Sequence, residues 1–304
     1  MNSIPQKQNE HNQIERLCAQ RSLYSRAKIL VGVQLTLAMV PALTFALLML
    51  KWPSLKVFAT LTSLTITLLD FGLLDPIQKA WRKTAAQIQE AFDCDVLKLD
   101  WTVLRAGKQP PPEDVMRYAR RAMAKPVEVA AVRDWYPKSV GELPVELGRL
   151  LCQRTNCHWD ATLRATYSFT ITISLWVVAI AVFIAGAIAN PTFDGFVLAM
   201  LAPATPAMVL ALRQHREHND ASRSSVQLRE HVDSLWQKAL CKEVELSSLT
   251  VESRAMQSEI FLRRATSSPV FNWLYNLLKK HQQEFADRSA DQLVAEAKQA
   301  LSIT

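Results

Sequence analysis

Four long runs of apolar residues dominate the hydrophobic pattern, at residues 29–50, 57–74, 167–189 and 196–212. Each run has 17 to 23 residues and carries at most one charge. An α-helix needs about 20 apolar residues to cross a hydrocarbon core of roughly 30 Å. Long helices buried in a water-soluble core are the alternative, but runs with so few charges leave little amphipathic pattern to face water. The pattern therefore predicts four membrane-spanning helices in two hairpins.

Polar segments lie before, between and after these hairpins. The tip of the first, residues 1–12, is predicted to be disordered, and an amphipathic helix is predicted from Gln13 into the first span. The insert between the hairpins alternates polar and apolar residues at 93–101, which predicts a short strand among helices. The fold class is therefore a mainly α membrane protein with a small α+β insert. The predicted segments are an N-terminal helix (1–28), a hairpin (29–75), a sensor insert (76–166), a second hairpin (167–212) and a helical tail (213–304).

The distribution of charge predicts the topology. Of the 35 Lys and Arg residues, 15 lie in the insert, 13 in the tail and 5 in the N-terminal segment, but only 2 in residues 51–56 and none in 190–195. Positively charged segments beside spans stay in the cytoplasm. Both termini and the insert are therefore expected to be cytoplasmic. The polar first 28 residues do not resemble a signal peptide, so the first apolar run is expected to be retained as a span.

The sequence offers little support for catalysis or metal binding. The five cysteines fall in segments predicted to be cytoplasmic, where structural disulfides are rare. Cys152 and Cys157 with His158 resemble part of a metal site, but no second ligand pair completes it. Phosphate-binding loops and hydrolase signatures are also missing. We therefore expect no enzyme, no metal and no cofactor. A membrane-embedded enzyme built on His158, Cys157 and Asp160 is the weak alternative.

The second and fourth spans carry the candidate pore residues. Thr60, Ser63, Thr67 and Asp70 share one helical face, which suits a hydrated pore wall. The alternative is that the hydroxyls bond carbonyls of their own helix and help helices to pack. In the fourth span, Pro203 and Pro206 remove two backbone donors within one turn, which predicts a bend. This bend is either a gate hinge or an accommodation to packing.

Arginines interleaved with aromatic residues are the candidate ligand site of the insert. Guanidinium groups bind phosphates in bidentate fashion and flat rings stack on bases, so the combination suits an anionic nucleotide. Surface charge or lipid contact is the alternative for any single arginine. The candidate nucleotide-binding residues are Trp101, Arg105, Arg120, Arg133, Trp135, Tyr136, Arg154 and Trp159.

Several motifs resemble those of one family. They are QN at 8–9, AQRSLYSRAK at 19–28, FDCDVLKLDW at 92–101, DWYP at 134–137 and LLCQRTNCHWD at 150–160, of which CQRTNC is the most specific. Their order around two pairs of spans resembles the SMODS-associated four-transmembrane pore-forming effectors. Asp100 departs from this pattern, in which proline is expected before Trp101. The resemblance covers nearly the whole chain and identifies no ligand-contacting residues.

The resemblance implies an effector of a bacterial antiphage system of the CBASS type, which kills the infected cell. In such systems a partner nucleotidyltransferase makes a cyclic di- or trinucleotide on infection, and the effector permeabilises the inner membrane. The centre of a single four-helix bundle is filled by side chains, so a pore predicts a homo-oligomer. The lipid bilayer is a further partner, and no DNA or RNA partner is expected. The alternative is a membrane-anchored receptor or scaffold that relays a signal to a protein without forming a pore.

Overall fold

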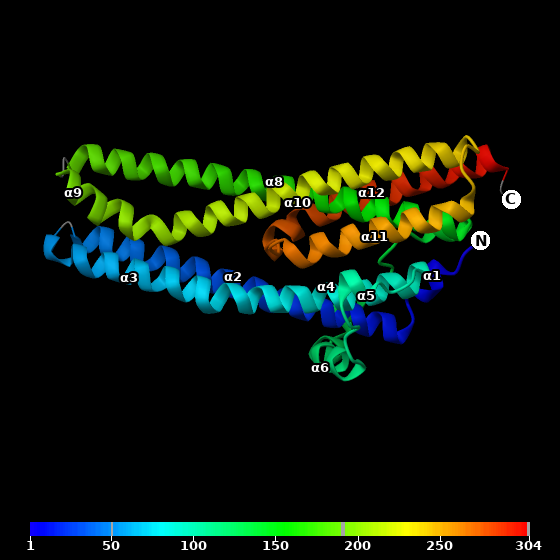
Figure 1. Cartoon of the computed structure of the whole chain (residues 1–304), viewed down its shortest axis with the longest axis horizontal. Coiled ribbons are helices and arrows are strands. Elements are labelled where there is room, and N and C mark those ends of the chain that lie inside the picture. The colour runs from blue at the N-terminus through cyan, green and yellow to red at the C-terminus, as the bar shows by residue number, and fades with distance from the viewer. Residues whose placement is uncertain (50, 190–191, 303–304) are drawn as a thin grey trace.

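The computed structural model describes residues 1–49, 51–189 and 192–302. Every regular element in these residues is helical, and the long helices follow one axis (Figure 1). The α-helices are α1 (Ile4–Lys7), α2 (His11–Met49), α3 (Lys56–Leu69), α4 (Asp75–Leu97), α5 (Val103–Ala106), α6 (Pro112–Met123), α7 (Pro126–Ala130), α8 (Val145–Ala189), α9 (Phe193–Phe196), α10 (Ala202–Leu240), α11 (Leu249–Thr266) and α12 (Asn272–Leu301). They are joined by 3₁₀ turns at Pro53–Leu55, Lys138–Glu142 and Leu246–Ser248, and by π-helical turns at Asp70–Leu74 and Val197–Leu201.

Two long hairpins make up one half of the molecule. α2 packs against α3, α8 packs against α10, and both pairs extend beyond the other helices in Figure 1. α2 and the continuous helix Lys56–Leu97 are long and apolar enough to cross a membrane. Only 18% and 11% of their apolar windows are buried, whereas a core helix of a soluble protein is mostly buried. These two helices correspond to the first predicted hairpin.

The second predicted hairpin is less directly supported. Its spans, 167–189 and 196–212, lie in α8 and in the segment from α9 into α10. Neither is among the helices that the described residues identify as long and apolar enough to cross a membrane. Leu50 of the first run and residues 190–191 of the second outer turn lie outside the described residues. Two of the four predicted spans are therefore supported, and the four-span topology remains a proposal.

The prediction of a strand at 93–101, and with it an α+β insert, is wrong for the described residues. Residues 93–97 are the last turn of α4, which ends at Lys98 in a left-handed conformation with φ of 53°. Asp93, Cys94, Val96 and Leu97 are all buried. A helix covered on several sides buries polar residues as well as apolar ones, so its sequence loses the helical period and mimics the alternation of a strand.

The N-terminal tip also differs from its prediction. Residues 4–7 form α1, and the side chain of Ile4 is 1% exposed. The side-chain amide of Asn2 donates hydrogen bonds to the carbonyl oxygens of Val140 (2.7 Å) and Leu143 (2.9 Å). A Cβ atom on Gly148 would lie 2.7 Å from that amide nitrogen, so this close approach needs glycine. The tip is therefore anchored by specific contacts that hydropathy does not reveal.

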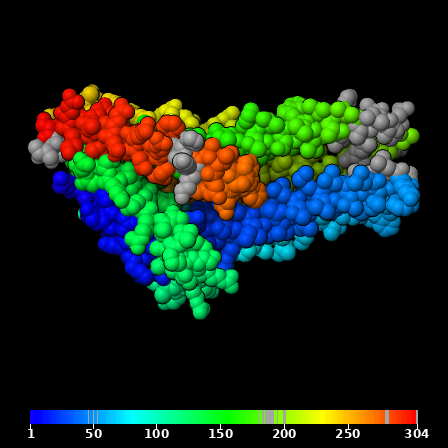
Figure 2. Space-filling model, turned by 180° about the vertical axis from the view of Figure 1, so that it is seen from behind, coloured from blue at the N-terminus to red at the C-terminus, as the bar shows by residue number. Residues whose placement is uncertain are grey.

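One hydrophobic core joins the segments outside the hairpins. Its buried side chains come from the N-terminal helix (Leu17), the insert (Phe92, Leu150) and the tail (Trp236, Val294). The region around α6 projects from this body as a separate lobe in Figure 2. The three polar segments of the sequence thus fold together, and the space between them holds the larger of the two cavities described below.

Candidate functional site

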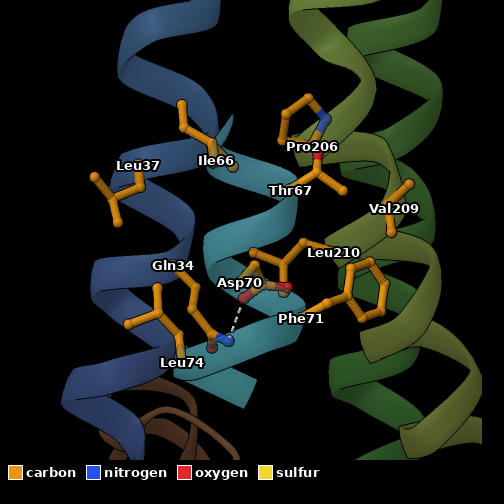
Figure 3. Close-up of a pocket in the computed structure, with 11 residues that line it drawn as sticks. Gln34, Leu37, Ile66, Thr67, Asp70, Phe71, Leu74, Pro206, Val209 and Leu210 are labelled. Atoms are coloured by element: carbon orange, nitrogen blue, oxygen red, sulfur yellow. Dashed lines mark hydrogen bonds between the residues drawn. The ribbon is translucent and has the colours of Figure 1, made fainter. Parts of the chain in front are cut away.

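A polar junction connects the two hairpins. Asp70, in the π-helical turn between α3 and α4, accepts a hydrogen bond from Gln34 Nε2 of α2 at 2.6 Å (Figure 3). Its other carboxylate oxygen accepts one from Arg213 Nη2 of α10 at 2.8 Å. Arg213 Nη1 also lies 3.4 Å from Asp75 Oδ1. These side chains are mostly buried, so the junction is a buried ion-pair network that links the first hairpin to α10.

The predicted pore face on α3 divides into two parts. Thr60, Ser63 and Thr67 donate hydrogen bonds to carbonyl oxygens four residues earlier, at 3.0, 2.9 and 2.9 Å. Thr67 and Asp70 also line a small cavity of about 10 Å³ between the hairpins, whereas Thr60 and Ser63 do not (Figure 3). Such a volume holds about one water molecule. The hairpins are therefore closely packed at this level, and the role of these residues in a pore stays a prediction.

The two prolines of the fourth predicted span lie just after a π-helical turn. α10 begins at Ala202, directly after the turn Val197–Leu201, and Pro203 and Pro206 are both buried. An irregular π-helical turn therefore directly precedes the prolines, while the bend predicted at Pro203 and Pro206 themselves stays a prediction. Pro206 lines the same small cavity as Thr67 and Asp70, but Pro203 is not among the residues that line it. The irregular segment therefore borders the junction between the hairpins.

A much larger cavity, about 610 Å³, lies between the N-terminal helix, the insert and the tail. Its walls are formed by α2, the 130–137 loop, the first half of α8, the end of α11 and α12. Among the described residues, six cationic side chains line it against two acidic ones, together with four aromatic residues. These residues are Arg21, Lys28, Arg133, Arg164, Arg263 and Arg264; Asp134 and Asp160; and Tyr24, Trp135, Trp159 and Tyr275.

Half of the cationic side chains are neutralised within the protein. Asp160 Oδ2 lies 2.8 Å from Arg164 Nε and 3.1 Å from Arg263 Nε. Burial on its own would raise the pKa of Asp160, but these two guanidinium groups outweigh it and lower the pKa to about 2. Arg264 is paired with the buried carboxylate of Asp93. The carboxylates of Asp160 and Asp93 are therefore already paired with arginines of the protein.

The other three cations remain available to a ligand. Within the described residues, the side chains of Arg21 and Arg133 make no hydrogen bond or ion pair. Lys28 Nζ donates a hydrogen bond to the side-chain oxygen of Asn272 at 2.7 Å, a neutral partner. Burial, with a smaller contribution from Arg21, lowers the pKa of Lys28 to about 8. Lys28 is still mostly protonated at neutral pH, and an anion in the cavity would raise its pKa again and could pair with these three side chains.

Only some of the predicted nucleotide-binding residues meet at this cavity. Arg133, Trp135 and Trp159 line it, but the other five lie elsewhere. The Tyr136 hydroxyl is buried and donates to Asp93 Oδ1 at 2.6 Å. Arg154 Nε donates a hydrogen bond to Asp233 Oδ1 at 2.5 Å, and Trp101 Nε1 donates one to the Gly107 carbonyl at 2.8 Å. Arg105 forms an ion pair with Glu259 at 4.0 Å, and Arg120 is exposed on α6.

The prediction missed the cavity residues that come from outside the insert. Arg21, Tyr24 and Lys28 lie on α2, and Arg263 and Arg264 end α11. The local signal for the α2 residues is a run of basic residues beside an apolar span, a pattern that also suits contact with anionic lipid headgroups. Bringing α2, α8 and α11 around one cavity is a tertiary arrangement that sequence spacing does not encode.

The residues proposed for an enzymatic alternative face different surroundings. Cys157 is buried, with its sulfur 4.0 Å from Arg263 Nη1, and burial raises its pKa. His158 is exposed, and its Nδ1 lies 3.1 Å from Arg229 Nη1. Asp160 is occupied by its two arginines. Among the residues that the structure describes, no group of three His, Cys, Asp or Glu side chains is arranged to hold a metal ion.

Comparisons with known proteins agree with the resemblance in sequence. The family model described as the SMODS-associating 4TM effector domain matches residues 2–293. A probable CBASS effector molecule of Bacillus cereus strain VD146 is 23% identical over 290 residues, covering 92% of this chain and 94% of that protein. No solved structure matches the chain. Because the family match extends over nearly the whole chain, the protein belongs to the SMODS-associating 4TM effector domain family.

Proposed function

We propose that this antiphage effector permeabilises the bacterial inner membrane when a cyclic di- or trinucleotide, made by a partner nucleotidyltransferase, binds the 610 Å³ cavity. Family membership supports the defence role and the membrane association. The observation that carries the ligand site is the group of unpaired cations beside aromatic walls. Cavities of about 300–1,000 Å³ are typical of small-molecule sites. Arg21 and Arg133 suit phosphate oxygens, and the tilted rings of Trp159 and Tyr275, 6.0 Å apart, suit contact with a base.

The cavity is connected to the membrane by continuous helices. Arg21 and Lys28 lie on α2, and Trp159 lies on α8, so a ligand between them contacts one helix of each hairpin. Both helices continue into apolar segments whose large side chains are exposed, such as Ile29 and Phe169. Lipid would cover these side chains. We therefore propose that α8 and α10 form a second membrane hairpin, giving four spans with both termini in the cytoplasm.

Permeabilisation requires more than one subunit in this proposal. The hairpins of one chain pack closely, with room for about one water molecule beside Asp70. A water-filled path would then form between several copies, as a homo-oligomer. Ligand binding would shift the equilibrium between a closed and an open arrangement of the hairpins. The ligand's effect is limited by how much better it binds the open arrangement.

Binding of cyclic di- and trinucleotides to the purified protein in lipid nanodiscs tests the ligand site. We expect one nucleotide to bind, and Arg133→Glu to weaken it roughly 10–100-fold, because a charge-assisted hydrogen bond contributes about 1.5–3 kcal/mol. Arg120→Glu is the matched control, because Arg120 is exposed on α6 outside the cavity. No binding by any nucleotide, or equal loss in both variants, would contradict the site.

A receptor that relays a signal without a pore is the second candidate. The hydroxyl groups of Thr60, Ser63 and Thr67 are satisfied by their own helix, which favours a packing role over a hydrated wall. Thr67→Leu and Asp70→Leu separate the candidates. If a pore acts, Thr67→Leu should lower permeabilisation, whereas Asp70→Leu, which removes the partner of Arg213, should raise leakage without ligand; both should still bind nucleotide. Unchanged permeabilisation and full defence activity in both folded variants would favour the receptor.

A further inference from the structure

The first turns of α12 present three different faces. Leu274, together with Val270 just before the helix, packs in a hydrophobic cluster with Leu163 and Tyr167 of α8. Asn272 and Asn276 line the large cavity. The third face points away from both: the side chains of Trp273 and Leu277 are 55% and 67% exposed. These two large apolar side chains, four residues apart, form an exposed apolar strip on this face.

Ring contacts between α12 and α8 show how far along the long axis of the molecule the face of Trp273 and Leu277 lies. The ring of Phe271 lies 6.2 Å from that of Tyr167, and the ring of Tyr275 lies 6.0 Å from that of Trp159. α12 therefore runs antiparallel to α8, away from the hairpins. Beyond Tyr167 toward the hairpin tip, α8 exposes large apolar side chains, beginning with Phe169. In Figure 2 the first turns of α12, in orange, are the part of this helix nearest the hairpins.

A contact with α2 places the start of α12 at the same height along the long axis. The side chain of Asn272 accepts a hydrogen bond from Lys28 Nζ, and the next residue of α2, Ile29, is 69% exposed and begins the first apolar run. α12 thus begins where the apolar surface of both hairpins begins. At 1.5 Å per residue, Trp273 lies about 3 Å beyond the level of Phe271, Leu277 about 9 Å and Phe285 about 21 Å. The headgroup layer on one side of a bilayer is roughly 5–7 Å thick.

We propose that Trp273 lies in the headgroup layer of the leaflet next to the tail, with Leu277 just beyond the outer edge of that layer. Trp273 lies at the level at which the exposed apolar side chains of the hairpins begin, and tryptophan is enriched where apolar and polar zones meet because its ring is amphipathic. This contact would hold α12, which forms one wall of the large cavity, against the lipid surface. It rests on the membrane position of the hairpins and does not depend on a cyclic nucleotide.

Nitroxide labels on α12 test this contact in the full chain in lipid nanodiscs. Cys241 is the exposed cysteine and the other four are buried, so Cys241→Ser gives a background for single labelled sites. Trp273→Cys, Leu277→Cys and Phe285→Cys report three depths on one helix, with Phe285, itself 63% exposed, as the matched aqueous control. Electron paramagnetic resonance then compares collisions with lipid-soluble oxygen and with a water-soluble nickel complex.

We expect the ratio of oxygen to nickel collisions to be several-fold higher at position 273 than at 285, with 277 in between. Equal ratios at 273 and 285 would overturn the proposal. A label at 273 that neither reagent reaches would also overturn it, because another protein surface would then cover Trp273. If Trp273→Cys does not fold, the comparison of 277 with 285 decides, and a ratio at 277 no higher than at 285 overturns the proposal.

Discussion

At the scale of single residues, Asp160 has the most consequential surroundings. Its carboxylate lies between the guanidinium groups of Arg164 and Arg263, and Ser225 Oγ donates a further hydrogen bond at 3.0 Å. The side chains of both arginines are almost fully buried, at 8% and 5% exposure. Charges buried in this way are stable only while each keeps its partner. Asp160 therefore supports the cavity wall and holds its cations in place.

We predict that Asp160→Asn destabilises the protein by about 3–5 kcal/mol, because two buried arginines lose their partner. The pKa of Asp160 is lowered from 3.8 to about 2, so its contribution to stability is complete well above pH 4 and is lost as the pH falls toward 2. Thermal unfolding in detergent should show a smaller loss of stability over this range in the variant than in the wild type.

The control for this prediction is Asp233→Asn. Asp233 also pairs with an arginine, Arg154, but its side chain is 42% exposed, so its loss should cost no more than about 1 kcal/mol. An Asp160→Asn protein that unfolds at the wild-type temperature and with the same acid sensitivity would contradict the role given to this cluster.

At the scale of elements, the π-helical turn at Asp70–Leu74 meets α2 and α10 at the charged junction. π-helical turns in long helices often mark functional positions. Asp70 of the turn and Asp75, the first residue of α4, both lie near the same arginine, Arg213. In the proposed function the two hairpins move relative to each other when the water-filled path forms between copies, so breaking this junction should favour the open arrangement.

We predict that Arg213→Gln raises dye release from proteoliposomes in the absence of ligand by roughly 10-fold or more. A buried ion pair costs about 3–5 kcal/mol to break, and about 1.4 kcal/mol suffices for a tenfold change. Arg216→Gln, an exposed arginine almost one turn further along α10, is the matched control and should leave the vesicles sealed. Unchanged leakage from folded Arg213→Gln protein would show that the junction does not hold the closed state.

The errors and successes of sequence reasoning are clearest at this scale. The shared face of Thr67 and Asp70 followed from helical spacing, and both line one small cavity. Arg213, the partner of Asp70, is 143 residues away, beyond the reach of any local pattern. The strand predicted at 93–101 failed because Asp93 is buried by its partners Tyr136, Gln257 and Arg264, whose positions depend on tertiary packing.

At the scale of the whole molecule, hydropathy located the two hairpins because their helices are long apolar runs, and two of these, in α2 and Lys56–Leu97, are long and apolar enough to cross a membrane. The same pattern could not show that the N-terminal helix, the insert and the tail enclose one cavity. Arg133, Trp135 and Trp159 were predicted within the insert, whereas Arg21 and Lys28 of α2 were missed. A binding site formed between distant segments depends on how those segments pack together, whereas the sequence pattern shows only which residue types each segment contains.

The proposed four-span topology predicts which residues a water-soluble reagent can reach from each side of the membrane. Ser54 and Thr192 lie exposed at the tips of the two hairpins, and Cys241 lies exposed in the tail. In a Cys241→Ser background, Ser54→Cys and Thr192→Cys should react with a membrane-impermeant maleimide added outside intact spheroplasts. Native Cys241 should react only after permeabilisation. Protection of position 192, or labelling of Cys241 in intact spheroplasts, would contradict the topology.

Dye release from liposomes containing the purified protein tests the central claim most directly. Cyclic di- and trinucleotides are added one at a time to vesicles in which the tail and the cavity face outward. We predict that one nucleotide releases the dye and that Arg133→Glu requires a roughly 10–100-fold higher concentration of it. Vesicles that stay sealed with a nucleotide shown to bind the same preparation would contradict the claim that ligand binding opens the membrane.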